Sequence, residues 1–216
     1  MFDLTLTFDN GPEPGVTDSV LDTLARHDVR TTFFVLGHKL AMPERRKLAE
    51  RAYAEGHWIG NHTWSHTTPL GMLDNPHQTE AEIVRTQAEI GSLAHARRFF
   101  RPFGGGGNLD ERLLNETALD VLKRDRFTCV LWNSIPRDWE DADGWVARAM
   151  MQAAAQPWTL MVLHDMPTGA MKHLDRFLGE ARDRGAVFRQ DFPPACVPVL
   201  EGEVVAPVDG YVAATN

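Results

Sequence analysis

The sequence predicts an α/β fold in which about seven parallel strands and their connecting helices form a (β/α) barrel. Short apolar and β-branched runs alternate with amphipathic helical segments along most of the chain, a pattern that implies parallel strands joined by right-handed crossovers. No dinucleotide-binding glycine fingerprint follows a predicted strand, which favours a barrel over an open doubly wound sheet. Polar residues follow several of the strands, at the edge where barrel enzymes place their chemistry.

The predicted strands share runs of apolar, β-branched and aromatic residues. The first run continues directly into the polar pair Asp9-Asn10, and several later runs also end in polar residues. The strands are predicted at residues 4–8, 29–36, 57–61, 98–100, 128–132, 159–163 and 185–188.

The predicted helices carry apolar residues at helical spacing on one face. Thr17 is the expected N-cap of the first helix. Tyr53 is expected to face inward on the second helix, and Val84 on the third. The helices are predicted at residues 16–27, 42–55, 78–94, 109–123, 144–155 and 171–184, and the tail after 194 has no strong pattern.

Length and composition are those of an ordinary globular protein, so we predict one domain over residues 1–216, with a core at 4–190 and a tail at 191–216. The 22 Lys and Arg against 30 Asp and Glu give a net charge of −8, which disfavours nucleic acid as a partner. No apolar run approaches membrane-spanning length and no signal peptide is visible, so a soluble, cytoplasmic protein is expected. Cys129 and Cys196 are too few for a disulfide framework.

The segment Thr7-Phe8-Asp9-Asn10-Gly11-Pro12 places a carboxylate and a carboxamide at the end of a buried strand. Such groups are costly to bury unless something pairs with them. Gly11 and Pro12 end the strand sharply, so Asp9 and Asn10 are predicted at its carboxyl-terminal edge. The alternative is a turn in which both side chains bond the local backbone.

Two histidines, His62 and His66, lie four residues apart. On a helical turn they would project from one face, a spacing suited to chelating one metal ion. Asn10 is the candidate oxygen ligand, and a set of two histidines and one oxygen leaves open positions for water and substrate. The alternative is a coincidental pair of surface histidines, because the chain contains 9.

Arg101 lies at the tip of a short predicted strand, where a guanidinium needs a carboxylate partner, and Asp9 on another strand tip is the candidate. The alternative is an ordinary salt bridge at the rim. The glycines at 104–107 lack the Lys-Ser/Thr ending of a phosphate-binding loop. They fit a loop whose backbone N–H groups approach a substrate oxygen, or a merely flexible turn.

His164 ends the apolar strand 159–163, where a lone histidine is more often structural than catalytic. A nearby carboxylate would raise the pKa of His164 and make it a better general acid, and Asp138 is the candidate. Trp139, directly after Asp138, suits the wall of a groove, with simple packing as the alternative.

Together and in this order, the motifs resemble those of the polysaccharide deacetylase family, also called carbohydrate esterase family 4, over residues 4–190. The resemblance implies a distorted, incomplete (β/α) barrel. It also implies an enzyme that uses a divalent metal, with zinc expected, to remove acetyl groups from N-acetylated sugars. The motifs are Thr7-Phe8-Asp9-Asn10-Gly11-Pro12, Asn61-His62-Thr63-Trp64-Ser65-His66, Arg101-Pro102-Phe103-Gly104, Asp138-Trp139 and Leu163-His164-Asp165.

The resemblance implies a pair of proton-transfer groups with one supporting residue each. Asp9 falls where the family has its general base, and His164 falls where it has the general acid that protonates the leaving amine. Arg101 falls at the residue that holds the base carboxylate, and Asp138 at the carboxylate that tunes the acid.

The metal and substrate positions carry over with departures. His62 and His66 fall at the metal-binding histidines, but Asn10 stands where the family usually has Asp, so a negative charge is lost and zinc affinity should fall. Phe103-Gly104 replaces the usual Pro-Tyr, so the glycine run is expected to open the site. We expect Phe103, Gly104 and Trp139 to contact the substrate.

Two other functions stay open. A hydrolase of a small, non-polymeric amide or imide, with little dependence on metal, is favoured by the altered third motif and the missing signal peptide. A non-catalytic sugar-binding module is favoured only by Asn10. The expected partner is an N-acetylated carbohydrate, and neither nucleic acid, a membrane nor a protein partner is implied.

Overall fold

The computed structural model describes residues 1–214, and within them the strands form a single curled, mixed sheet. The strand order is β6-β1-β2-β3-β4-β5-β8-β9, with β7 also paired to β1. Strands β1 to β7 pair in parallel, and the last two pair antiparallel, so the predicted barrel of about seven parallel strands is confirmed. The strands are β1 (Phe2–Asp9), β2 (Thr32–Val35), β3 (Trp58–Asn61), β4 (Phe99–Phe100), β5 (Thr128–Cys129), β6 (Trp158–His164), β7 (Ala186–Arg189), β8 (Val199–Leu200) and β9 (Glu203–Val204).

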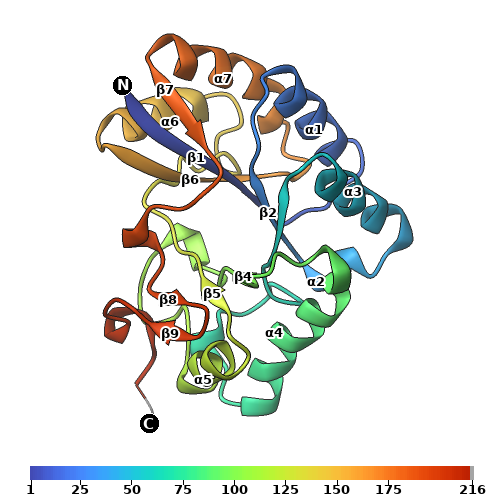
Figure 1. The fold of residues 1–216 in the computed structure, drawn as a ribbon, viewed down its shortest axis with the longest axis vertical. Coiled ribbons are helices and arrows are strands. Elements are labelled where there is room, and N and C mark those ends of the chain that lie inside the picture. The colour runs from blue at the N-terminus through green and yellow to red at the C-terminus, as the bar shows by residue number, and fades with distance from the viewer. Residues whose placement is uncertain (215–216) are drawn as a thin grey trace.

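The helices cover the outside of this sheet. Figure 1 shows α7, α1, α3, α4 and α5 in an arc around the strands. None of the helices in residues 1–214 is long and apolar enough to cross a bilayer. The helices are α1 (Thr17–Arg26), α2 (Gly37–Leu40), α3 (Pro43–Ala54), α4 (Pro76–Ile90), α5 (Glu116–Arg124), α6 (Trp145–Ala154) and α7 (Leu174–Asp183).

The barrel is irregular at β1 and between β5 and β6. The first half of β1 pairs with β7, whereas Thr7 to Asp9 pair with β2. The chain beyond β5 meets β6 at a bridge between Ser134 and Met161 instead of a full strand, and there Val162 N donates to Ser134 O at 3.0 Å. Because an isolated bridge stands here in place of a full strand pairing, the barrel is incomplete at this point.

The alternation along β1 separates an apolar face from a polar one. Leu4, Leu6 and Phe8 are fully buried in the core that lies between the sheet and helices α1, α6 and α7. Thr7 and Asp9 face the interior of the barrel, where both accept hydrogen bonds from one arginine. The first strand therefore anchors the helices on one side and carries polar groups on the other.

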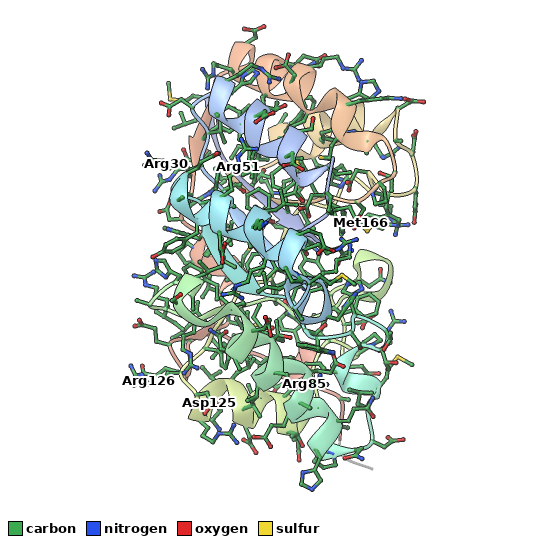
Figure 2. All side chains as sticks on the ribbon, turned by 90° about the vertical axis from the view of Figure 1, so that its right-hand side faces the viewer. Arg30, Arg51, Arg85, Asp125, Arg126 and Met166 are labelled. Carbon is green, nitrogen blue, oxygen red and sulfur yellow. The ribbon has the colours of Figure 1, made fainter. Side chains whose placement is uncertain are left out.

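The two ends of the barrel can be followed in side view. In Figure 2, Met166, just beyond β6, lies at one side of the molecule. Arg30 and Arg126, which precede β2 and β5, lie at the opposite side. The side that carries Met166 is therefore the carboxyl-terminal end of the strands.

Several local predictions are wrong. Val16, not Thr17, is the N-cap of α1, and the Thr17 hydroxyl instead donates to Asp165 Oδ2 at 2.5 Å. Tyr53 is 49% exposed and Val84 37% exposed, so neither faces inward. The helix expected at 109–123 begins only at residue 116 because the Asn115 side chain accepts a hydrogen bond from the N–H of Ala118 and caps it there.

The tail forms an antiparallel hairpin that the sequence pattern did not reveal. Val199 of β8 pairs with Cys129 of β5, and Leu131 N donates to Cys196 O at 2.8 Å. Strands of two residues are too short to show an alternation. The hairpin extends the sheet beyond β5.

Gly60 of β3 lies where the sheet has no room for a side chain, because an added Cβ would come within 2.6 Å of the Phe34 ring. We expect Gly60→Ala to lower the free energy of unfolding by about 1–3 kcal/mol through overpacking. Urea denaturation checks this. Gly179→Ala on α7 is the control: apart from its own helix backbone, an added Cβ would meet no heavy atom of residues 1–214 within 4 Å, so stability should stay or rise by up to about 1 kcal/mol. A Gly60→Ala variant as stable as wild type would contradict the packing of β3 on β2.

Candidate active site

The predicted site residues gather at the carboxyl-terminal ends of the strands. Asp9 and His164 are the last residues of β1 and β6, and His62 and Arg101 directly follow β3 and β4. A cavity of about 170 Å³ lies at this end. Each predicted residue except Arg101 and Asp138 lines it, and these two are fully buried behind their partners. The lining comprises Asp9, Asn10, His62, His66, Pro102, Phe103, Gly104, Gly106, Gly107, Trp132, Ile135, Trp139, Val162, His164 and Met166.

Arg101 holds Asp9 from inside the barrel. Its Nη1 donates to Asp9 Oδ1 at 2.9 Å and to Thr7 Oγ1 at 2.6 Å. Nε and Nη2 donate to the backbone carbonyls of Val130 and Leu131 at 3.0 and 3.2 Å. Burial lowers the pKa of Arg101, and the charge of Asp9 opposes that effect. The pair is a buried, hydrogen-bonded ion pair and not a rim salt bridge.

The second oxygen of Asp9 is directed toward the first histidine. Asp9 Oδ2 lies 3.6 Å from His62 Nε2. His62 Nδ1 lies 2.8 Å from the backbone oxygen of Arg101. A carbonyl can only accept, so Nδ1 carries the proton and Nε2 keeps a free lone pair. Nε2 is therefore the atom of His62 that is free to bind a ligand.

His66 lies beside His62, although no helical turn joins them. The two ring centroids are 4.8 Å apart, and His66 lies 3.8 Å from the ring centroid of Phe103. The expected helical turn is wrong because Thr63 and His66 adopt left-handed backbone angles, with φ of 69° and 54°. Burial lowers the pKa of His62 to about 3 and that of His66 to about 2, so both rings are neutral at pH 7.

Asn10 presents an unpaired oxygen to the same space. Its Nδ2 lies 3.4 Å from the sulfur of Met166, which takes up the amide's donor side. Its Oδ1 is buried and has no hydrogen-bond partner among the described residues. A buried acceptor left without a partner costs about 1–3 kcal/mol, so a ligand at this atom is expected. The sequence pattern gave no signal for Met166.

His164 is held by Asp138 through two hydrogen bonds. Its Nδ1 donates to Asp138 Oδ1 at 2.8 Å, and its backbone N–H donates to Asp138 Oδ2 at 2.9 Å. The Trp139 ring packs edge-on, 4.8 Å from the imidazole. Burial lowers the pKa of His164, but the hydrogen bond and charge of Asp138 outweigh burial, so the pKa lies above its ordinary value. His164 is thus suited to donate a proton from Nε2.

The glycine run does not open the site as expected, because Trp132 fills the space. A Cβ on Gly104 would lie 2.6 Å from the Trp132 ring, and Trp132 Nε1 donates to Gly107 O at 3.2 Å. Arg137 Nη2 donates to Gly106 O at 3.2 Å, so the loop is tied down rather than loose. Trp132 lines the cavity and was missed as a site residue because an aromatic residue at the end of a strand normally indicates core packing.

The donor set fits a divalent metal ion. Two neutral imidazoles and one unpaired carboxamide oxygen face the same cavity, and imidazole nitrogens combined with an oxygen donor suit borderline cations such as zinc. Across residues 1–214, no group of three or more His, Cys, Asp or Glu side chains is arranged to hold a metal. The third ligand would therefore have to be Asn10, which lies outside those residue types.

Comparison with known proteins gives the family. The family model described as polysaccharide deacetylase matches residues 3–130. A chitooligosaccharide deacetylase of Rhizobium leguminosarum bv. trifolii is 37% identical over 169 residues, which are 74% of this chain and 70% of that protein. The chain belongs to the polysaccharide deacetylase family. The resemblance inferred from the motifs is confirmed.

Two further proteins are similar to this chain. The peptidoglycan-N-acetylglucosamine deacetylase PgdA of Listeria monocytogenes is 29% identical over 186 residues, which cover 86% of the chain and only 37% of the relative's length. A family 4 acetyl xylan esterase from Clostridium thermocellum superposes with a TM-score of 0.71 at 28% identity, with 87% of each chain covered. The distorted barrel is thus the fold of this family.

Replacing the partner of His164 should shift its titration. In Asp138→Asn the charge is lost and the burial stays, so the pKa of His164 should fall from above 6.5 to below it. NMR titration of the imidazole resonances measures this shift. Asp143→Asn is the control, because Asp143 lies 3.1 Å from His173 at the surface and should leave His164 unchanged. An unshifted His164 in Asp138→Asn would contradict the assigned pairing.

Proposed function

We propose that this chain is a metal-dependent amide hydrolase that removes acetyl groups from N-acetylated sugars of the chitooligosaccharide or peptidoglycan type. The observation that carries the proposal is a single cavity lined by a carboxylate and an imidazole with separate buried partners. Arg101 binds Asp9, and Asp138 binds His164. Two groups held in opposite protonation states are what hydrolysis of an amide requires.

Asp9 is the proposed base and His164 the proposed acid. Oδ1 of Asp9 is occupied by Arg101, so Oδ2 is the atom that accepts a proton from the attacking water. His164 donates its Nε2 proton to the leaving nitrogen, and Asp138 stabilises the imidazolium before that transfer. Gly104 lines the cavity, and its backbone N–H is the donor that we propose for the carbonyl oxygen of the acetyl group.

Asn10, His62 and His66 would hold the metal, for which zinc is our proposal. When bound, a divalent ion would polarise the acetyl carbonyl and make a water molecule acidic near neutral pH. The fit of the donor atoms supports this proposal. It is also supported by the 28% identical acetyl xylan esterase of Clostridium thermocellum, whose structure is in complex with a cobalt ion.

A smaller substrate is the second candidate. Trp132 and Ile135 pack against the glycine loop, and the cavity measures about 170 Å³. A cavity of this size, walled by the packed glycine loop, suits a compact amide or imide. Failure of sugar oligomers to react would favour this second candidate. Binding of oligomers without release of acetate would instead favour a sugar-binding module.

The first experiment measures acetate release from N-acetylglucosamine oligomers by chelated protein and after zinc is restored. We expect no release from the chelated protein and recovery with zinc, because the metal supplies the carbonyl activation. Asp9→Asn and His164→Ala should each reduce zinc-restored turnover by about 10²–10⁴-fold. Glu89→Ala on α4 is the matched surface control and should keep full activity. Full turnover in either site variant would refute its role.

Asn10→Asp should bind zinc more tightly than wild type. The added carboxylate brings one negative charge to the ligand position, and we expect a gain of about tenfold or more. Competition with a chromophoric chelator measures the Kd. Met166→Leu removes the sulfur near the amide of Asn10. In the wild-type background it should weaken zinc binding, and in the Asn10→Asp background it should leave the zinc affinity unchanged. Equal or weaker affinity of Asn10→Asp would show that Asn10 is not a ligand.

A further inference from the structure

The segment that joins the two metal-site histidines is held in an unfavourable backbone conformation. We call residues 62–66 the histidine loop. Thr63 and His66 have φ of 69° and 54°, in the left-handed region that β-branched and bulky residues rarely adopt. Such residues persist only where the surroundings over-determine them. The histidine loop therefore needs contacts that fix it from outside.

Glu82 of α4 supplies such a contact between the two histidines. Its Oε2 accepts the backbone N–H of Trp64 at 2.9 Å and that of Ser65 at 2.8 Å. One carboxylate oxygen thus binds two consecutive amides in the middle of the histidine loop. Hydrogen bonds to a charged acceptor are roughly twice as strong as neutral ones.

The opposite edge of the loop is bound to α2. Gly37 N donates to Thr63 O at 3.0 Å, and His38 N donates to Trp64 O at 3.2 Å. Two carbonyls of the histidine loop are therefore held by α2, while two of its amides are held by Glu82. The loop is thus hydrogen-bonded on both sides.

The Trp64 side chain completes the attachment to α4. The guanidinium of Arg85 lies 3.9 Å from the Trp64 ring centroid. Arg85 and Glu82 are three residues apart, so they lie on one face of the helix, and Figure 2 shows Arg85 on α4. Gly37 leaves room for this ring, because a Cβ there would come within 2.4 Å of it.

We propose that Glu82 is a positioning residue that fixes the histidine loop and thereby sets the metal affinity of the site. The inference rests on the proposed function only in naming a metal as the ligand of His62 and His66. Glu82 acts through the backbone of Trp64 and Ser65 and donates no group to the cavity. Without it, the left-handed residues relax and the two imidazoles no longer converge on one ion.

The test compares Glu82→Ala and Glu82→Gln with Glu89→Ala. Glu89 lies on the same helix and contacts Arg46 at 3.4 Å instead of the histidine loop. Zinc Kd is measured by chelator competition, and the absorption spectrum of the cobalt-loaded protein reports the ligand geometry. Loss of a group that orients metal ligands typically costs about 10–100-fold in affinity, which we expect for Glu82→Ala. Glu82→Gln should recover most of it, because its amide oxygen still accepts, and Glu89→Ala should match wild type.

A metal-free measurement separates this inference from the proposed function. Hydrogen exchange at the amides of Trp64 and Ser65 should be faster in Glu82→Ala and unchanged in Glu89→Ala. If Glu82→Ala does not fold, Glu82→Asp, whose shorter side chain cannot reach both amides, serves in its place. Unchanged exchange, or zinc affinity equal to wild type, would overturn the inference. A wild-type chain that binds no zinc would overturn the metal part of both, while faster exchange would still support the positioning of the loop.

Discussion

The buried ion pair between Arg101 and Asp9 is the interaction on which the rest of the site depends. A guanidinium with no exposed surface is stable only if each of its donors finds an acceptor. Those acceptors come from β1 and from the chain directly after β5, at the point where the barrel lacks a full strand pairing. Arg101 therefore bridges the gap in the sheet with the same hydrogen bonds that orient the Asp9 carboxylate.

Around this pair, burial lowers the pKa of three histidines, but a bound carboxylate reverses the outcome for one of them. His62 and His66 have no carboxylate held against them as closely as Asp138 is held against His164, so burial dominates and keeps them neutral. His164 has such a partner at 2.8 Å, and its pKa rises instead. The same low-dielectric cavity thus contains lone-pair donors and a proton donor, and the largest part of the difference comes from Asp138.

The sequence predicted the barrel and the residues of the site better than it predicted how they are held. Motifs placed at strand ends identified Asp9, His62 and His164, because parallel strands bring their carboxyl ends to one edge. The left-handed histidine loop, the Trp132 contact and the tail hairpin were not predictable in this way. Each depends on contacts between segments far apart in the chain, which leave no local periodicity, and only the folded backbone shows that Glu82 reaches Trp64.

The close approach of Trp132 to Gly104 has a consequence for how this site can change over evolutionary time. The two positions are epistatic: a side chain at 104 is compatible only with a smaller residue at 132, and a smaller residue at 132 leaves a void unless 104 is enlarged. A lineage that exchanges the aromatic wall of this cavity must therefore alter both codons. Homologous sequences should show covariation between these positions, and an aromatic residue transplanted to 104 alone would meet the indole already there.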